Sequence, residues 1–576
     1  MMEEEAMNGL VEFPQNRTLY VDQFTDDAPY SQEERMGVQA NCLEDAFGHY
    51  RPKKADVAME SLDGSIRLET FHFHDMEDFE DDRLIEQSES LLMEKETIDT
   101  LRAIIFQLGK NKALRNALND KKSRDGLREM LVAIAGMLGA SRDVDIQKTA
   151  AIQHENLSVL RNVISNIENL DPSHPARSAV FLSDSMYYET RLKLKSELEL
   201  WVSLLKTDDA DPEKIINECN NRYTEAEQHL QKMLLHVREE ISRLEITYRS
   251  LEAFFANAGQ GCAGQITLMN TKKKDLALRD SEDLIAVRTE LKNNYDTLDL
   301  KKSYSLLVIP GYPGDADTLR RWASIAHSNK VILATDFKDC HDFNELKEEL
   351  QRAHLNGSDV ELANVVMSCN YLLGRKKSEL AGEEDDLYIP GSGALAGRMA
   401  NTDEISIIQG VVGREYGVLN HVKGVRIDLL KSETATLINQ GVIPMVSEGG
   451  RVIAFSNRTL YNGTSINLQE YPVVRMFEWV KKVLMNYTHE IALENWNPYK
   501  SPRELKEKIQ QFLNHYQIYH NYFSSYKVGE PFQNPNTKNV TVELSITPFY
   551  TNKNYLVKLQ ADNKNHKVSD IKIEQQ

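Results

Sequence analysis

The chain has 576 residues, which is too many for one hydrophobic core, so its length predicts three or four domains. A hydrophobic content of 41% with 27% charged residues is typical of a globular protein, and no apolar run approaches the ~20 residues of a membrane-spanning helix. The net charge is −20, of which −16 falls on residues 1–90, where 23 acidic and 7 basic side chains lie. Because no basic stripe is present, the chain is not expected to bind nucleic acid.

Residues 1–40 are interpreted as an acidic N-terminal arm, although their composition is equally typical of a solvated, disordered tail. The first residues, MMEEEAMNGL, lack the positive and apolar regions of a signal peptide. The five cysteines are scattered and form no CxxC pair. These features predict a cytoplasmic protein with no membrane partner, no disulfide framework and no zinc site.

Residues 41–135 contain a predicted hairpin followed by helices. Two strand-like runs flank Asp63-Gly64, a dipeptide that favours a tight β-turn. A helix is expected to end at Gly109, and a second helical piece is expected over Ala113–Leu118. The first helix is indicated by apolar residues at helical spacing, namely Leu101, Ile104, Ile105 and Leu108.

His72 and His74 share one face of the second strand of this hairpin, next to Asp75. This geometry can bind a metal ion, but no third and fourth ligand follow at a useful spacing. Solvated histidines are therefore the preferred interpretation.

Residues 136–211 are polar and helical and are interpreted as a connector. Residues 212–260 are expected to form one long helix, because apolar residues alternate spacings of four and three along a heptad seam. The seam consists of Leu230, Leu234, Val237, Ile241, Leu244, Tyr248, Leu251 and Phe255. It predicts either a helix packed within its own protomer, which we prefer, or an intermolecular coiled coil.

Residues 261–515 show the alternation of an α/β domain. Buried strands are expected at 265–269, 304–309 and 331–335. Helices are expected at 318–327, 343–353, 359–373, 427–440, 471–493 and 502–516. Two strands joined by a Gly-Gly turn are expected within 441–460.

Residues 516–576 are interpreted as a C-terminal β-hairpin and a polar tail. Apolar residues alternate with polar ones in two runs, which are Val540, Val542, Leu544 and Ile546, then Tyr555, Val557 and Leu559. A two-stranded hairpin with one apolar face is marginal alone and needs a sheet to join.

Glycine-rich segments give weak signs of ligand binding. Residues 259–264 spell GxGxxG, but a helix precedes them and a strand follows, which inverts the dinucleotide-binding order. Residues 391–398 lack a Lys-Ser/Thr end, and close helix packing explains their small residues equally well. Cys340 and His341 are adjacent, so they rarely present nucleophile and base to each other. No catalytic, cofactor-binding or metal-ligating residue is predicted.

Several segments resemble the contractile tail-sheath family, which includes phage tail sheaths and the large sheath subunit of type VI secretion systems. One is the strand–turn–strand of 441–460 that ends in Arg458-Thr459-Leu460, with Phe455-Ser456 where sheaths usually have Trp-Gly. Another is the motif Leu-Glu-x-x-Tyr-Arg-x-Leu at 244–251, whose Tyr248 stands where the family usually has Trp. The order of features from 230 to 559 follows the large subunit, and residues 41–135 resemble the small one.

The resemblance implies a contractile-sheath fold of mixed α/β (α+β) class, with long helices, a central mixed sheet and terminal exchange strands. It implies a structural subunit that polymerises helically around an inner tube and contracts to propel it, and not an enzyme. The implied partners are other protomers, with or without a separate small sheath subunit, the inner-tube ring protein, the baseplate and an AAA+ unfoldase. No cofactor is implied.

The same resemblance assigns roles to two sets of residues. Strand exchange between protomers would use the C-terminal hairpin residues given above. Arg458, Thr459 and Leu460 would lie in the core or at a protomer interface. Arg458 would then be a buried, bidentate partner of a carboxylate, or else an exposed ion pair of little energetic value.

The alternative function is a cytoplasmic α/β enzyme that binds a nucleotide or phosphate. Its loop would be Gly311-Tyr312-Pro313-Gly314, which follows the strand ending at Ile309. However, Pro310 and Pro313 leave few N–H groups for a phosphate, and no acid, base or metal cluster accompanies them.

Overall fold

The computed structural model describes residues 16–27, 29, 31–62, 64–110, 125, 128, 212–259, 265–297, 302–379, 385–401, 405–491, 497–498 and 500–549, and the backbone of short strands between 556 and 574. The chain divides into two units, of which the smaller holds Lys54–Phe71 and Phe79–Glu240. The helix predicted over Ala113–Leu118 and the connector predicted over 136–211 lie outside the described residues.

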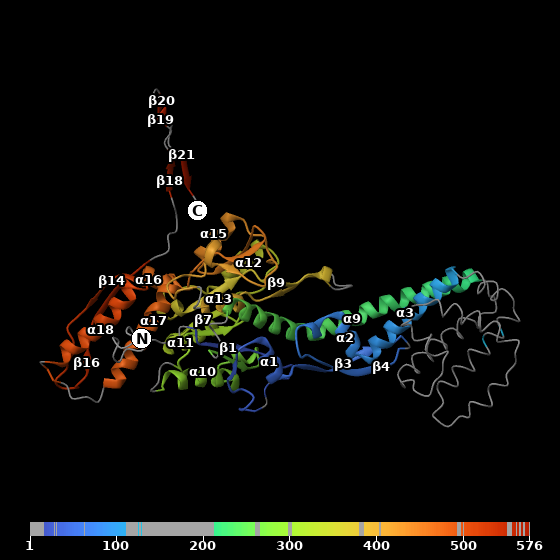
Figure 1. The fold of residues 1–576 in the computed structure, drawn as a ribbon, viewed down its shortest axis with the longest axis horizontal. Coiled ribbons are helices and arrows are strands. Elements are labelled where there is room, and N and C mark those ends of the chain that lie inside the picture. The colour runs from blue at the N-terminus through green and yellow to red at the C-terminus, as the bar shows by residue number, and fades with distance from the viewer. Residues whose placement is uncertain are drawn as a thin grey trace. The chain divides into compact units, whose positions relative to one another are not determined.

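The larger unit contains a nine-stranded mixed sheet (Figure 1). Neighbours from β12 (Ile443–Glu448) to β5 (Ile266–Asn270) are parallel. In contrast, β11 (Val418–Leu419), β13 (Arg451–Ala454) and β2 (Val38–Ala40) run antiparallel to the strands they join. The predicted mixed α/β class is confirmed. In spatial order the strands are β11 (Val418–Leu419), β13 (Arg451–Ala454), β12 (Ile443–Glu448), β8 (Val365–Cys369), β7 (Ile332–Asp336), β6 (Leu306–Ile309), β1 (Thr18–Asp22), β5 (Ile266–Asn270) and β2 (Val38–Ala40).

Strand β1 comes from the acidic N-terminal segment and lies between β5 and β6. All of its residues are buried. The disordered-tail alternative is therefore wrong for Thr18–Asp22, because a short apolar run within an acidic region completes the parallel core. Strand β2, from the same segment, closes one edge of the sheet.

Most of the described helices belong to the larger unit or run into it. Helix α13 (Ser392–Ala400) packs against the central strands β6 and β7, and α11 (Ala316–Ser328) packs against β7. The helices of this unit are α1 (Leu43–Tyr50), α10 (Glu282–Tyr295), α11 (Ala316–Ser328), α12 (Phe343–Ala353), α13 (Ser392–Ala400), α14 (Gly413–Tyr416), α15 (Lys431–Asn439), α16 (Ile466–Gln469), α17 (Tyr471–Ile491) and α18 (Ser501–Ile518), with short 3-10 turns η2 (Glu77–Phe79), η5 (Asp275–Ala277), η7 (Val360–Asn364) and η8 (Lys377–Glu379).

The helix predicted over 359–373 is wrong. That stretch holds η7, then β8, then β9 (Leu372–Arg375), which pairs with β10 (Leu387–Ile389). A short apolar run such as Val365–Met367 fits a buried strand or a buried helix equally well by periodicity alone. The Gly-Gly hairpin is confirmed, since Gly449 and Gly450 have φ of 59° and 78° between β12 and β13.

The smaller unit combines a β-ribbon with helices. Strands β3 (Lys53–Glu60) and β4 (Ile66–His72) form the predicted hairpin, whose turn has Gly64 at φ 80°. Helices α2 (Asp81–Gln87) and α3 (Glu89–Lys110) follow. The first part of the long helix α9 (Pro212–Ala258) is tied to them by Arg238–Asp81 and by His229–Glu94, the latter at 2.9 Å.

The C-terminal part packs α17, α18 and β14 (Phe523–Val528) around Trp479 and Phe512. Strand β14 pairs with β17 (Leu544–Pro548), and β15 (Phe532–Gln533) pairs with β16 (Val540–Thr541). Strand β18 (Leu556–Leu559) pairs with β21 (Ile571–Glu574), and β19 (Asp562–Asn563) pairs with β20 (His566–Lys567). The hairpin predicted between 540–547 and 555–559 is therefore wrong, because each run has another partner.

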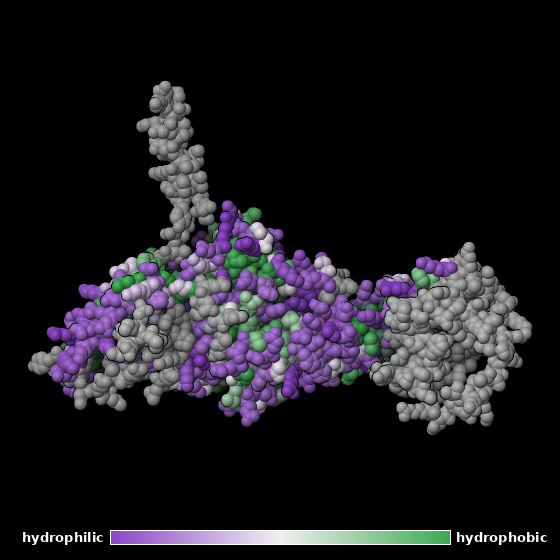
Figure 2. Space-filling model, viewed as in Figure 1, coloured by the Kyte–Doolittle hydropathy of each residue, from purple (hydrophilic) through white to green (hydrophobic). Residues whose placement is uncertain are grey.

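The surface is mainly polar. Figure 2 shows hydrophilic residues over most of the visible described surface, with hydrophobic ones in small groups. Among the described helices, none is both long and apolar enough to cross a membrane.

Candidate functional site

The heptad seam of α9 is buried within the chain. Its residues from Leu234 to Leu251 are at most 3% exposed. The ring of Tyr248 stacks on Phe47 with centroids 4.2 Å apart, and its hydroxyl donates to the carbonyl oxygen of Phe24 at 3.2 Å. The preferred interpretation, a helix packed inside its own protomer, is confirmed for this part of the seam.

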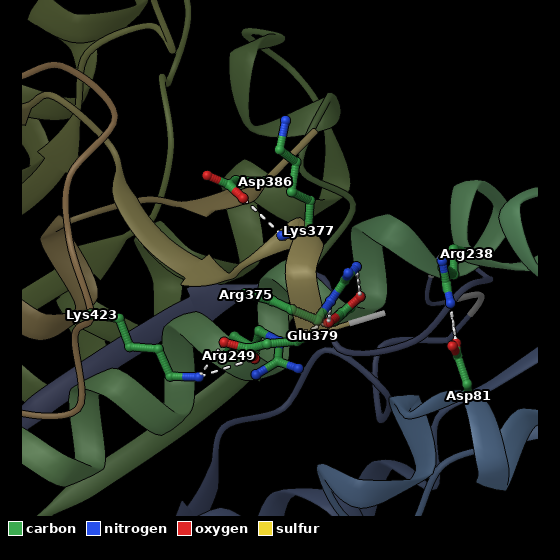
Figure 3. A network of polar contacts seen from close by, with 9 residues as sticks. Asp81, Arg238, Arg249, Arg375, Lys377, Glu379, Asp386 and Lys423 are labelled. Atoms are coloured by element: carbon green, nitrogen blue, oxygen red, sulfur yellow. Dashed lines mark hydrogen bonds and ion pairs between the residues drawn. The ribbon is translucent and has the colours of Figure 1, made fainter. Parts of the chain in front are cut away.

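The glutamate of the Leu-Glu-x-x-Tyr-Arg motif, Glu245, is the centre of a buried ion cluster, and its partners Arg249 and Arg375 are labelled in Figure 3. Arg375 of β9 donates to both carboxylate oxygens of Glu245, at 2.8 and 3.1 Å. Arg249, one turn further along α9, donates to the same carboxylate at 2.7 Å. Because Glu245 is 1% exposed, the pair fixes strand β9 to helix α9 with little competition from water.

A second polar group, drawn in the same figure, fixes the base of the β9–β10 ribbon. The ammonium of Lys423 lies 2.8 Å from one carboxylate oxygen of Glu379, and the pKa of Glu379 is lowered chiefly by this hydrogen bond. The backbone N–H of Lys377 donates to Asp386 at 2.7 Å. These exposed contacts add little stability individually, so the buried Glu245 cluster is the main polar anchor of the ribbon.

The glycines of 391–398 allow α13 to lie directly against α9. A Cβ atom on Gly393 would lie 2.7 Å from the carbonyl oxygen of Ser250. One on Gly397 would lie 3.0 Å from the carbonyl carbon of Phe254 and nearer still to its oxygen. Close helix packing therefore accounts for the small residues of this segment, which was one of the two interpretations of its sequence.

The loop after β6, where a phosphate was considered, is filled by the chain's own groups. The N–H of Gly311 donates to Asp336 at 2.8 Å, and the N–H of Ser392, at the start of α13, donates to the same carboxylate at 2.8 Å. The hydroxyls of Ser368 and Ser392 also donate to it. Burial raises the pKa of Asp336, and these hydrogen bonds act against that rise. A phosphate would meet a buried carboxyl here and no available N–H of Gly311.

Arg458 is buried, at 9% exposure, but its partner is an amide and not a carboxylate. Its guanidinium donates to the side-chain oxygen of Gln469. Burial lowers the pKa of Arg458, and the nearby carboxylate of Glu470 acts in the opposite direction. The exposed ion pair is thus excluded, and the bidentate carboxylate pair is replaced by a charge-assisted bond to an amide.

Thr459 and Leu460 belong to the core. The hydroxyl of Thr459 donates to the carbonyl oxygen of Leu468 at 2.6 Å, and the N–H of Leu460 donates to Val365 at 3.1 Å. Gly441 has φ 86°, and a Cβ there would lie 3.0 Å from the carbonyl oxygen of Thr459. The Arg-Thr-Leu segment therefore joins β8 to the turn after α15.

The predicted exchange residues are divided between different strands. Leu544 and Ile546 of β17, with Val542, are half-buried against the α17–α18 core, whereas Val540 in β16 is 39% exposed. Val557 and Leu559 lie in β18. Tyr555 and the predicted turn before it lie outside the described residues.

The remaining candidates do not assemble into a site. His72 and His74 are exposed, and His74 lies 3.3 Å from Asp78. His341 contacts Arg426 and not Cys340, whose pKa burial raises to about 12. In the part of the chain that the structure describes, no group of three or more His, Cys, Asp or Glu side chains could hold a metal ion.

Helix α17 carries a buried polar stripe that the sequence analysis missed. Its members recur every three or four residues and are each about 5% exposed, namely Arg475, Glu478, Lys482 and Asn486. The ammonium of Lys482 donates to the carbonyl oxygen of Tyr304 at 2.5 Å. Burial lowers the pKa of Lys482 to about 7, with Glu478 acting against the shift. The sequence signal for this stripe was the helical spacing of charged residues within an otherwise apolar helix face.

Several solved structures with detectable similarity come from contractile systems. The baseplate structure of the anti-feeding prophage has a chain 16% identical, covering 55% of this chain and 80% of its own, with a TM-score of 0.41. A contracted sheath complex of an extracellular contractile injection system is 14% identical, with coverages of 58% and 86% and a TM-score of 0.41. A sheath tail protein of Desulfitobacterium hafniense is 8% identical, with coverages of 51% and 60% and a TM-score of 0.34. No curated protein matches the chain.

Family profiles match most of the chain. The profile of the central domain of type VI secretion system TssC/VipB matches residues 236–462. The profiles of the TssC/VipB-like N-terminal region and C-terminal domain match 144–234 and 470–573. The matched ranges contain the buried Glu245 cluster, the Arg458 segment and the C-terminal strands. The chain therefore belongs to the TssC/VipB family and is a structural sheath subunit of a contractile injection system.

Proposed function

We propose that the protein polymerises helically around an inner tube of ring proteins, beginning at a baseplate, and contracts to propel that tube. Family membership supports this proposal. In such a mechanism rigid protomers rotate into a packing with larger interfaces, and the free energy of the new contacts drives the movement. Assembly would take place in the cytoplasm, without a catalytic step, and an AAA+ unfoldase would dismantle the contracted sheath.

Residues 41–135 would act as a small-subunit-like module, in place of a separate small sheath subunit or beside one. The described part of this module has its own β3–β4 ribbon and the helices α2 and α3. The test is whether the purified full-length chain forms tubes alone. If tubes form only when a second, smaller chain is added, the module does not replace a separate small sheath subunit.

The observation that best supports assembly by strand exchange is the free edges of the β14–β17 ribbon. Among the described residues, these strands of six and five residues pair only with each other. The nine-stranded sheet, in contrast, ends in strands of three and two residues. Addition of a strand by a neighbour needs a long exposed edge, so the ribbon is the better acceptor.

The donor that we propose is the segment containing β18 and β21. It follows the ribbon directly and carries Val557 and Leu559 in β18. The ribbon itself is anchored, because Leu544 and Ile546 pack on the α17–α18 core. A donated strand would therefore extend a sheet that already has a fixed position in its protomer.

The test is a chain that ends at Phe549, which keeps β14 and β17 and removes β18–β21. We expect its thermal unfolding to match that of the full chain, while sedimentation and negative-stain microscopy show small species and no tubes. A matched control replaces residues 550–576 by a Gly/Ser linker of equal length and is expected to behave identically. Tubes from either chain would reject donation by this segment. Loss of folding would reject it too, because the segment would then belong to its own protomer's core.

A phosphate-binding enzyme is not favoured, because Asp336 already accepts the N–H groups of Gly311 and Ser392. This conclusion would be reversed if the unmodified chain hydrolysed a nucleotide and a Gly311→Pro variant, in which Asp336 is unchanged, did not.

A further inference from the structure

Two histidines meet at the C-terminal end of α18. His515 lies in the last turn of the helix, which ends at Ile518, and His520 lies in the turn that follows. Asn521, with φ 52°, turns the chain back, and the N–H of Tyr522 donates to the carbonyl oxygen of Tyr516 at 3.1 Å. This turn brings the two imidazoles together although they are five residues apart.

The Nε2 atoms of His515 and His520 lie 3.3 Å apart. This separation is long for an N–H hydrogen bond, whose usual range ends near 3.2 Å. Two nitrogens that bind one tetrahedral zinc ion, each at about 2.0–2.1 Å, are about 3.3 Å apart. The geometry of the pair therefore fits a shared metal ion at least as well as a hydrogen bond.

Each imidazole also contacts a tyrosine ring of the same turn. Tyr516 is 1% exposed, and the ring of His520 stacks on it with centroids 5.1 Å apart. The ring of His515 packs on Tyr519 at 5.2 Å. The carbonyl end of α18 lies at the same place, and the negative end of a helix dipole favours a cation.

We propose that His515 and His520 bind one divalent cation of the zinc class through their Nε2 atoms. Imidazole is a preferred ligand of zinc, copper and nickel. Within the described ranges no third His, Cys, Asp or Glu joins the pair, so water completes the coordination. The site is independent of the sheath function, and it lies outside the β14–β17 pairing described above.

The test uses the full-length chain without a histidine tag, stripped with a chelator and then equilibrated with zinc chloride at pH 7.5. The measurements are zinc per chain by elemental analysis and affinity by competition with a chromogenic chelator. His520→Gln, which changes an exposed side chain, is expected to lose one zinc per chain or at least ~10-fold in affinity, since even second-shell changes cost that much. His515→Gln is expected to do the same.

The matched control is the double variant His72→Gln/His74→Gln, which removes the other neighbouring histidine pair. It should bind zinc as the unmodified chain does, and melting of each variant without zinc verifies folding. Zinc should also raise the melting temperature of the unmodified chain and not that of His520→Gln. The proposal would be overturned by any of three results. These are unchanged zinc binding in His520→Gln, loss of zinc binding in the control variant, and no zinc binding by the unmodified chain.

Discussion

Replacing Gly397 by alanine should destabilise the protein, although alanine is the better helix former. Gly397 lies in the helix α13, where its missing side chain faces the backbone of Phe254 in α9. An added Cβ would lie 3.0 and 3.1 Å from the carbonyl carbon and the Cα of Phe254, and closer still to the oxygen. These atoms are backbone of a long helix and cannot rotate away, so the two helices must separate.

Two effects of opposite sign determine the magnitude. Alanine in a helix interior gains about 0.5–1 kcal/mol over glycine. Overpacking of a well-filled contact usually costs about 1–3 kcal/mol and occasionally more. The added Cβ would clash with backbone atoms of Phe254, which cannot move aside. We therefore expect the cost to exceed the gain and the free energy of unfolding to fall by about 1–3 kcal/mol.

Gly48 provides a matched control of opposite sign. It also lies inside a helix, α1, but nothing stands within 4 Å of the position that its Cβ would take. Gly48→Ala should therefore raise the free energy of unfolding by about 0.5–1 kcal/mol. The two variants are compared by urea unfolding monitored by circular dichroism, and their transitions should have equal m-values. A Gly397→Ala variant as stable as the unmodified chain would show that α13 and α9 do not touch as described.

Three further changes test other contacts. Ile241→Ala should lower the free energy of unfolding by about 2–5 kcal/mol in a denaturant melt, because Ile241 is fully buried in the seam of α9; normal melting with lost assembly would indicate an intermolecular seam instead. Glu245→Gln should cost about 3–5 kcal/mol in the same assay, since it leaves Arg375 buried without its carboxylate, and a loss within 1 kcal/mol would refute the buried pair. Lys482→Met should stabilise the chain most at pH 7 and below, and thermal melts should show the advantage shrinking as pH rises from about 7 toward 10.5. The sign follows because the pKa of Lys482 is lowered to about 7 in the folded chain, so the unfolded chain binds more protons in that window and stability rises with pH; an advantage independent of pH would contradict it.

Elements with an unambiguous local signal were predictable from the sequence. The helix over Phe343–Ala353 and the Gly-Gly turn of the β12–β13 hairpin match their predictions. A capping aspartate, Asp342, and two glycines with positive φ specify these features without tertiary help. Local chemistry therefore fixed where these elements begin and end.

Elements whose identity depends on partners far along the chain were not predictable. Strand β8 reads equally as a helix until β7 and β12 lie on either side of it. Strand β17 has the alternation of a hairpin arm, but which strand it pairs with depends on the position of β14 on α18. The partners of Glu245 and Arg458 are likewise set by tertiary structure, since Arg375 and Gln469 are not marked by any motif.

The fold also explains why an α/β sheet of this size need not host an enzyme. In open parallel sheets, ligands usually bind at the carboxyl ends of the strands, where loop N–H groups and helix N-termini converge. Here Asp336, at the end of β7, accepts the N–H of Gly311 and the first N–H of α13, and Asp22, at the end of β1, lies 3.6 Å from Lys273. The groups that would recognise a substrate instead hold loops and helices to the sheet. Such internal pairing favours a rigid protomer, which is what a subunit that works through its contacts with neighbours requires.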